Sequence, residues 1–233
     1  MSIRSTIACT LLFLFTLPAQ SEVLWSSFSL SYLQGNNYEV GDNKRKILTF
    51  EHAAGTSWGD SFFFVDHIRS NNDDIETYGE WSPRFKLFDV ENSIVPAFYL
   101  AGTLEMKTAN NSDGFTNYLM GVGTDIKIPH FDFFKVNLYY RNNELGDNNY
   151  QSTISWGVPI GPLYYDGFAD ISTSTDNKSA STNFTSQLKY DVAPHIGLSS
   201  KLFVGIEYVY WINKFGIKGI DEKNANLLVK YHF

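Results

Sequence analysis

Apolar and polar residues alternate along most of this chain with a period of two. From Leu24 to Tyr32, for example, the even positions are mainly apolar and the odd positions are mainly serine. A period of two is typical of β-strands, because successive side chains point to opposite faces of a sheet. The pattern therefore predicts an all-β protein of about 12 strands, at 23–34, 45–54, 61–69, 77–88, 95–107, 115–125, 132–142, 149–158, 162–171, 182–192, 199–212 and 224–233.

The connections between these segments alternate in character. Those at 35–44, 70–76, 108–114, 143–148, 172–181 and 213–223 are long and rich in Asn, Asp, Ser and Gly. Those at 55–60, 89–94, 126–131, 159–161 and 193–198 are shorter, and three of them carry a proline, Pro129, Pro159 and Pro194. Periodicity alone leaves a soluble β-sandwich open. An even strand number with long loops at one end favours a transmembrane antiparallel up-and-down β-barrel of the bacterial outer membrane, spanning residues 22–233.

The first 21 residues are expected to be a signal peptide. Arg4 provides the positively charged N-terminal region, an apolar run extends from Ile7 to Leu17, and small residues precede a cleavage site after Ser21. An N-terminal membrane anchor is the alternative, but the run has about half the length that a spanning helix needs. Cys9, the only cysteine of the sequence, lies within this segment. The mature chain is therefore expected to contain no disulfide and no cysteine-based site.

The last strand segment ends on an aromatic residue. Leu227, Val229, Tyr231 and Phe233 share one face, a pattern similar to the assembly signal of outer-membrane barrels. Together with the signal peptide, this pattern predicts recognition by the barrel assembly machinery through Phe233. The expected location is the outer membrane of a Gram-negative cell, where the barrel contacts outer-membrane lipid and lipopolysaccharide.

Composition and charge exclude several other functions. A net charge of −7 argues against a nucleic-acid partner, which requires a basic surface. A mean hydropathy of −0.20 suggests a soluble protein, but alternation hides a membrane barrel from average hydropathy. A phospholipase barrel would need a His two residues before a Ser, and none of the five histidines has one. The histidines are also too dispersed for a zinc site, so we expect no enzyme, no cofactor and no metal.

Charged residues identify the face that lines the lumen. A charge at the centre of a bilayer costs about 2–4 kcal/mol, so the charged face of each strand should point inward. Because both signs occur, many of these side chains are expected to pair across the barrel. The predicted inward charges are Glu51, Glu80, Arg84, Lys86, Glu105, Asp125, Lys135, Arg141, Asp166, Asp170, Lys189, Asp191, Lys201, Glu207 and Lys230.

Aromatic residues share this charged face. In the apolar run Phe62 to Asp66, the carboxylate of Asp66 decides the parity, so Phe62 and Phe64 should point into the lumen with Asp60. Arg69 then falls on the outward face at the rim, where it can snorkel. An inward ring either packs against a loop or plug or provides a stacking surface for a flat ligand. Further aromatic residues with inward parity are Tyr99, Tyr164, Phe168, Phe203 and Trp211.

Three motifs resemble the Tsx family of nucleoside-specific channels, which includes OmpK-type proteins: Glu80 to Phe85, Trp58 to Asp66 and Met120 to Ile126. The resemblance implies a monomeric twelve-stranded barrel that passes nucleosides and deoxynucleosides. It also implies a bacteriophage receptor, although the outer loops here are shorter and differ in sequence. Carried over residue by residue, it implies that base and sugar contact Glu51, Phe62, Phe64, Asp66, Glu80 and Arg84.

The lumenal face adds further candidate binding residues, which are Tyr99, Glu105, Asp166, Phe168 and Asp170. Two interpretations of the function stay open at this point. The first is a channel for selective, passive diffusion of nucleosides. The alternative is a structural or adhesion-type barrel, or a general small-solute pore without nucleoside selectivity.

Overall fold

Strands occupy the segments in which apolar and polar residues alternate. The computed structural model describes residues 22–233, so the predicted signal peptide lies outside the described residues. Within that range the strands are β1 (Val23–Gly35), β2 (Arg45–Thr56), β3 (Gly59–Ser70), β4 (Ile75–Asp89), β5 (Ala97–Ala109), β6 (Phe115–Asp125), β7 (Phe133–Asn142), β8 (Asn149–Ile160), β9 (Leu163–Ser172), β10 (Ser181–Asp191), β11 (Leu202–Ile212) and β12 (Glu222–His232).

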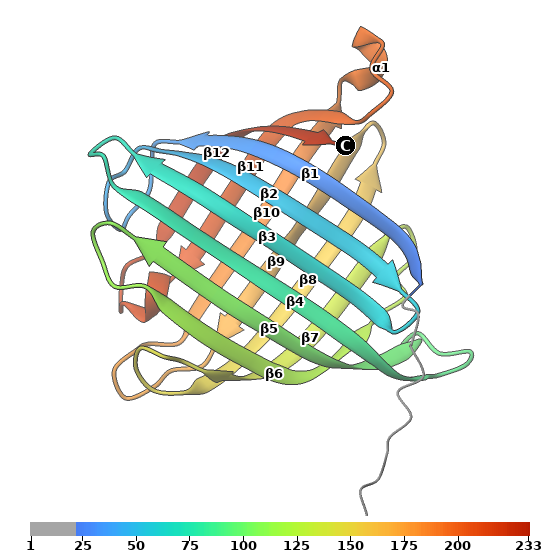
Figure 1. Ribbon diagram of the computed structural model, residues 1–233, viewed down its shortest axis with the longest axis horizontal. Helices are drawn as coiled ribbons and strands as arrows, with labels where there is room; N and C mark the ends of the chain where they lie inside the picture. Colours follow the sequence, from blue (N-terminus) through green and yellow to red (C-terminus); the bar gives the residue numbers. More distant parts are fainter. Residues whose placement is uncertain (1–21) are drawn as a thin grey trace, which may run out of the picture.

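Every strand pairs antiparallel with its neighbours in sequence, and β1 pairs with β12 to close the sheet (Figure 1). In the closing ladder, Ser31 lies opposite Lys230 and Leu33 lies opposite Leu228. Closure leaves no unpaired strand edge. The predicted fold class, an antiparallel up-and-down barrel of twelve strands, is confirmed within residues 22–233.

The connections were predicted to be long at one end of the barrel and short at the other, and this holds only in part: the connection between β10 and β11 (192–201) has ten residues, whereas the one between β3 and β4 (71–74) has four. We call the two ends the long-loop end and the short-connection end, and two short helices lie in their connections. The long-loop end carries the connections after β1, β3, β5, β7, β9 and β11, the last of which contains the 3-10 helix η1 (Lys214–Gly216). The short-connection end carries the others, including α1 (Ala193–Ile196) between β10 and β11.

The predicted bounds of two of these turns are wrong. The connection predicted at 55–60 consists of Ser57 and Trp58 alone. Pro159, predicted to lie in a turn, belongs to β8, while the turn itself is Gly161 and Pro162. Pro159 lies beyond Gly157, where the ladder with β7 ends, so the proline occupies the kind of sheet margin at which its missing N–H is tolerated.

The outer face of the barrel is apolar. Met120 and Leu227 are 68% and 69% exposed, and this face continues around the sheet. No helix within residues 22–233 is long and apolar enough to cross a membrane. So large an exposed apolar surface is far beyond what soluble monomers carry and suits a lipid environment. Other exposed apolar side chains with outward parity are Phe28, Leu30, Tyr32, Leu48, Phe50, Leu100, Val122, Leu138, Tyr140, Leu188, Val204, Ile206 and Val229.

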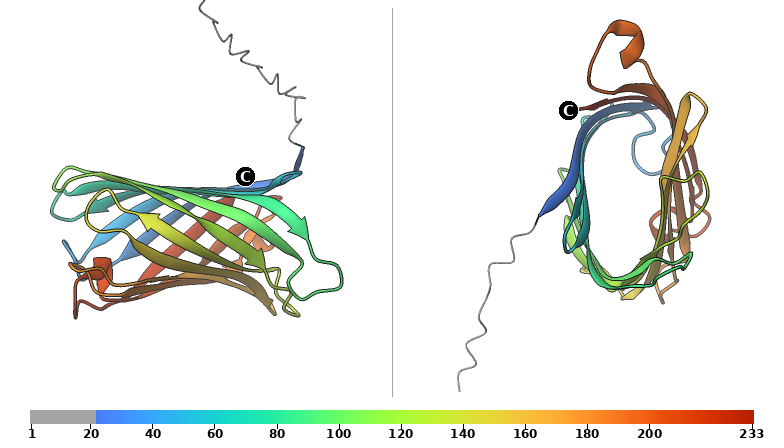
Figure 2. Two further views of the ribbon diagram at one scale, coloured as in Figure 1. Left: turned by 90° about the horizontal axis from the view of Figure 1, so that it is seen from below. Right: turned by 90° about the vertical axis from the view of Figure 1, so that its right-hand side faces the viewer.

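The inner face is polar and faces the space that the strands enclose, which the right-hand view of Figure 2 shows along the barrel. Its side chains are well covered by one another, which reverses the usual arrangement of an apolar core inside a polar surface. Buried polar residues on this face include Ser29, Ser31, Thr49, Asn117, Asn137, Asn224 and Asn226.

Candidate functional site

Ion pairs between strands that are not neighbours establish which face lines the lumen. Lys135 on β7 lies 3.1 Å from Asp60 on β3, and Lys230 on β12 pairs with Glu51 on β2. Other strands separate the members of each pair, so these side chains meet only inside the closed barrel. Because directly opposite residues share a face of the sheet, the register extends the assignment along whole rows.

The register places the predicted binding residues on this lumenal face. They are Glu51, Phe62, Phe64, Asp66, Glu80, Arg84, Tyr99, Glu105, Asp166, Phe168 and Asp170. Lys86, another predicted inward charge, also lies on this face, because it is opposite Tyr99 in register; it pairs with the exposed Asp89 beside the β4 bulge. Lys201 was predicted to line the lumen, but it is exposed in the connection before β11, where the alternation of that strand no longer applies.

Arg84 is the centre of a network at the short-connection end. Its Nε and Nη2 donate to Asp60 at 2.9 and 2.5 Å, and Nη2 also donates to Asp125 at 2.8 Å. The guanidinium lies 4.2 Å from the Tyr99 ring centre, and the Tyr99 hydroxyl donates to Asp125. Asp60 accepts a further bond from Lys135. Arg84 is therefore engaged by protein groups and only 3% exposed, with Nη1 alone lacking a partner in the described chain.

This network also borders a cavity of about 340 Å³ beside the turn between β6 and β7. Asp125 and Lys135 line it together with Phe131 and Phe134 from the turn region. No group of three or more metal-binding side chains occurs here or elsewhere in residues 22–233.

Three further predicted site residues are paired with cations. Glu51 accepts from Ser29 at 2.7 Å and pairs with Lys230. Asp166 accepts from Lys189 Nζ at 2.8 and 2.6 Å through its two oxygens. In the same way, Glu105 accepts from Arg141 Nη2 at 2.5 Å and from Asn117 at 2.8 Å. The expectation that opposite charges pair in the lumen is confirmed for these carboxylates.

Four lumenal carboxylates have only neutral hydrogen-bond partners in the described chain: Asp66, Glu80, Asp170 and Glu207. Asp170 on β9 is near enough to Glu80 on β4 for the two charges to interact across the lumen. These carboxylates retain acceptor capacity. Their donors are the hydroxyls of Thr49, Tyr78 and Thr153 and, for Glu207, the amides of Gln187 and Asn226.

A row of aromatic rings runs along the same wall. The ring centres of Phe62 and Phe64 are 6.1 Å apart, those of Phe64 and Tyr78 are 5.8 Å apart, and those of Tyr78 and Phe115 are 6.4 Å apart. We call these four residues the aromatic row; it spans β3, β4 and β6. Phe62 is 40% exposed although it lies inside the barrel. Glu80 is bonded to the Tyr78 hydroxyl, so carboxylate and rings form one surface.

Sequence reasoning missed two members of the aromatic row. Tyr78 has the same parity as Glu80, and Phe115 has the same parity as Asp125, so the signal was present in the alternation. Phe168 faces the lumen as its parity predicted, on β9 between Ser155 and Thr185, but no ring contact joins it to the row within residues 22–233.

The loop after β1, residues 36–44, bends into the lumen at the long-loop end (Figure 2). Tyr38 from this loop is 8% exposed, packs with Leu33, Ile47 and Leu228, and donates its hydroxyl to Asn226 at 2.8 Å. Burial, reinforced by nearby carboxylates, raises the pKa of the Tyr38 hydroxyl, which therefore stays protonated and donates. This position of Tyr38 could not be predicted from the alternation, because the loop has no periodic pattern of apolar and polar residues.

Two cations flank the Tyr38 ring. Arg45 lies 4.7 Å from its centre, and Lys214 from η1 lies 5.7 Å from it. Lys214 also donates to Glu222 at 2.5 Å in a buried pair. Burial lowers the pKa of Lys214 although Glu222 opposes the shift. Together these contacts hold the loop against the β12 side of the lumen and narrow its mouth.

Comparison with known proteins identifies the fold. Neither a scan of protein families nor a search of curated proteins finds a match to this sequence. Among solved structures, KdgM porin is similar with a TM-score of 0.53 and 10% identity, over 89% of this chain and 99% of the KdgM chain. KdgM porin in complex with disordered oligogalacturonate gives a TM-score of 0.52 with the same identity and coverage. The chain thus shares the barrel architecture of a porin.

Proposed function

We propose that this chain is a passive channel of the Gram-negative outer membrane that selects nucleosides. The closed barrel, its apolar outer face and its polar lumen support a membrane pore. The likeness to KdgM porin supports the same architecture. Selectivity for nucleosides rests on the groups that line the lumen and on the motifs that resemble the Tsx family.

The aromatic row is the observation that carries this proposal. A nucleoside presents a flat base and a ribose with hydroxyl donors. The neighbouring rings of the aromatic row offer successive stacking positions for the base. Stacking of a base on an aromatic ring contributes about 1–3 kcal/mol to binding and tolerates different bases. Asp66 and Glu80 lie beside Phe64 and have no cationic partner, so they can accept from ribose hydroxyls.

The charge of the lumen favours neutral solutes over acidic ones. KdgM porin has been solved with an oligogalacturonate, which is a polyanion. In the present lumen Asp66, Glu80, Asp170 and Glu207 lack cationic partners, and they would repel such a chain. We therefore assign this channel a neutral, flat solute rather than an acidic oligosaccharide.

A barrel with a closed lumen and a structural role is the second candidate. It is favoured by the side chains that narrow both ends, Tyr38 at the long-loop end and the Arg84 network at the short-connection end. Rings that merely pack against these groups would bind no solute.

Planar-bilayer recording separates the two candidates. Purified protein should conduct small ions, and adenosine or thymidine should reduce the current while a galacturonate oligomer should not. Phe64→Ala should weaken the nucleoside block about 5- to 150-fold, which corresponds to the loss of one stacked ring at 1.4 kcal/mol per factor of ten. Phe63→Ala is the matched control, because Phe63 is the outward neighbour on the same strand and contacts Phe50. Equal block of Phe64→Ala and wild type would favour the structural candidate.

A further inference from the structure

Two cations lie directly opposite each other on the outer face of the barrel. Lys46 on β2 is paired in register with Arg69 on β3, and both side chains are exposed. Lys46 shares its face with the outward Leu48 and Phe50, whereas Asp66 on β3 has the opposite parity. Both residues are next to the strand termini of the long-loop end.

Nothing in the described chain neutralises this pair. Neither Lys46 nor Arg69 takes part in an ion pair or side-chain hydrogen bond within residues 22–233. Two acids of the nearby loops are engaged by loop groups: Asp42 accepts from the backbone of Lys44 and Asn72, and Asp74 accepts from the Asn72 amide. Like charges directly opposite on a sheet are destabilising, so an external anion between them would stabilise the strand pair.

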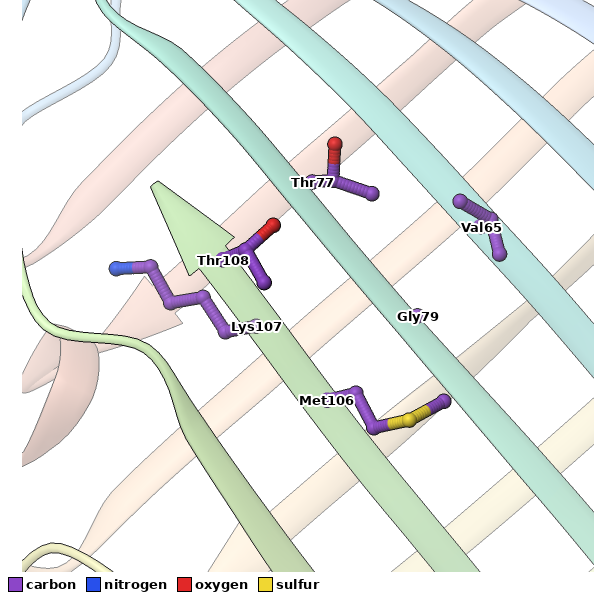
Figure 3. Close-up of a pocket in the computed structure, with 6 residues that line it drawn as sticks. All are labelled: Val65, Thr77, Gly79, Met106, Lys107 and Thr108. Carbon is purple, nitrogen blue, oxygen red and sulfur yellow. The ribbon is translucent and has the colours of Figure 1, made fainter. Parts of the chain in front are cut away.

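An apolar groove lies further down the same outer face. It has a volume of about 100 Å³ and is lined by Val65, Thr77, Gly79, Met106, Lys107 and Thr108 (Figure 3). A Cβ at Gly79 would lie 2.9 Å from the Phe64 carbonyl oxygen and 3.1 Å from Val65 Cγ2, so a larger residue does not fit there and no side chain from this position fills the groove. A hydrocarbon chain suits such a depression, since it can lie over Gly79 between Val65 and Met106 without introducing a polar group.

The groove and the cation pair have the spacing of one lipid molecule. Val65 and Arg69 are four residues apart on β3, which is about 13 Å along the strand. The exposed His67 lies between them on the same face. Cations at the rim with an apolar groove below match a phosphorylated headgroup with acyl chains beneath it.

We propose that the outer face of β2 to β5 at the long-loop end binds lipopolysaccharide through its phosphorylated lipid A. A phosphate lies between Lys46 and Arg69, and an acyl chain occupies the groove at Gly79. This site rests on the proposed outer-membrane placement, with the long loops outward, and is independent of nucleoside selectivity. It would anchor one lipid of the outer leaflet against β3.

Titration of detergent-solubilised full-length barrel with lipid A, followed by native mass spectrometry, tests the site. Wild type should retain lipid A, and the double variant K46Q/R69Q should bind it about 30-fold more weakly, since each cation near a membrane surface contributes about 1 kcal/mol. The double variant K127Q/K201Q removes the same charge from exposed lysines at the short-connection end and should bind like wild type. Equal binding by K46Q/R69Q and wild type would overturn the proposal.

Two further measurements distinguish binding of the lipid A headgroup from binding of its acyl chain. Dephosphorylated lipid A should bind wild type about as weakly as intact lipid A binds K46Q/R69Q, and inorganic phosphate alone should not compete at equal concentration. Thr108→Leu fills the groove and should weaken lipid A binding about fourfold, as expected for one displaced methylene, whereas the outward Thr182→Leu on β10 should not. Tight binding of dephosphorylated lipid A would contradict the headgroup assignment.

Nucleoside block provides the independent readout. K46Q/R69Q should conduct and be blocked by adenosine like wild type, because neither residue lines the lumen. If wild type failed to retain lipid A while adenosine still blocked the current, the lipid A site would be overturned and the proposed nucleoside channel would stand. If wild type retained lipid A but adenosine did not block, the lipid A site would stand and nucleoside selectivity would be overturned.

Discussion

Lys135 on β7 and Asp60 on β3 meet inside the barrel, with Nζ 3.1 Å from Oδ2, although β4, β5 and β6 separate their strands. The same Asp60 receives two bonds from Arg84 on β4. One carboxylate thus joins three strands of a curved wall. These contacts hold β3, β4 and β7 together at the short-connection end, where the side chains of Arg84 and Tyr99 narrow the lumen.

Asp60→Asn should destabilise the barrel and widen this end. The change leaves Lys135 unpaired and Arg84 with Asp125 alone. Removing one partner of a dry buried pair costs about 3–5 kcal/mol, and we expect about 1–3 kcal/mol here because lumenal water reaches the site. Urea unfolding in detergent should show the loss, and single-channel conductance should rise.

Asp89→Asn is the control for this change. Asp89 pairs with Lys86 in an exposed contact three residues away, and such pairs contribute about 0–1 kcal/mol. It should therefore leave both stability and conductance unaltered. An equal effect of the two substitutions would show that the crossing pair has no special role.

Tyr38→Ala should open the long-loop mouth. The substitution removes the ring that packs on Leu33 and Leu228 and the hydroxyl that bonds Asn226. Without this anchor the loop after β1 should leave the lumen, so single-channel conductance should increase and nucleosides should bind with faster exchange. Tyr118→Ala is the control, because Tyr118 is 60% exposed on the outer face. Unchanged conductance in Tyr38→Ala would mean that the loop does not limit the pore.

The alternation of side chains was sufficient to predict the strands and their two faces. A residue such as Glu51 cannot face lipid, and one such residue per strand determines the orientation of all the others on that strand. The same logic fails beyond strand ends. Lys201 precedes β11, so the parity of that strand does not determine where its side chain lies.

The candidate site was only partly predictable for a different reason. Parity places Phe64 and Tyr78 in the lumen, but their ring contact depends on register and on which strands adjoin. The contact between Lys135 and Asp60 depends on the curvature of the barrel, and Tyr38 depends on the path of a loop. These are three-dimensional properties that no local pattern encodes.

Topology can be tested with inserted epitope tags. The loops near Asn110 and Asp176 belong to the long-loop end, which should face the outside of the cell. Tags there should react with antibody on intact cells. A tag near Asn92, in the connection between β4 and β5, should react only after the membrane is permeabilised. Labelling of the Asn92 tag on intact cells would contradict the orientation.

Removal of Phe233 should impair membrane insertion rather than conduction. Phe233 is 71% exposed, and its ring meets that of the outward Tyr231 at 5.2 Å. It contacts no lumenal group, so molecules that do insert should conduct normally. Quantitative blotting of outer-membrane fractions measures insertion, and Phe233→Tyr, which keeps the ring, serves as the control. Normal outer-membrane levels of the truncated chain would argue against an assembly role.

The excess of carboxylates should make the pore prefer cations. Glu80 and Asp170 interact across the lumen and have only hydroxyl donors. Two neighbouring carboxylates disfavour each other's ionisation, so the pair is expected to act on passing ions with about one unit of negative charge. One unit charge at 4 Å in water is worth about 1 kcal/mol, which is a factor of about five in relative permeability. Reversal potentials in a KCl gradient should therefore favour K⁺ over Cl⁻ in wild type, and the double variant E80Q/D170N should lose about fivefold of that preference.

Salt and a matched control distinguish this lumenal effect from surface charge. The preference should shrink at 1 M salt, where the Debye length is about 3 Å, and persist at 0.1 M, where it is about 10 Å. The control E91Q/D176N removes the same charge from exposed connections outside the strands and should leave reversal potentials unchanged. If E80Q/D170N and E91Q/D176N behaved alike, ion preference would arise at the mouths, and Glu80 and Asp170 would not face the permeation path.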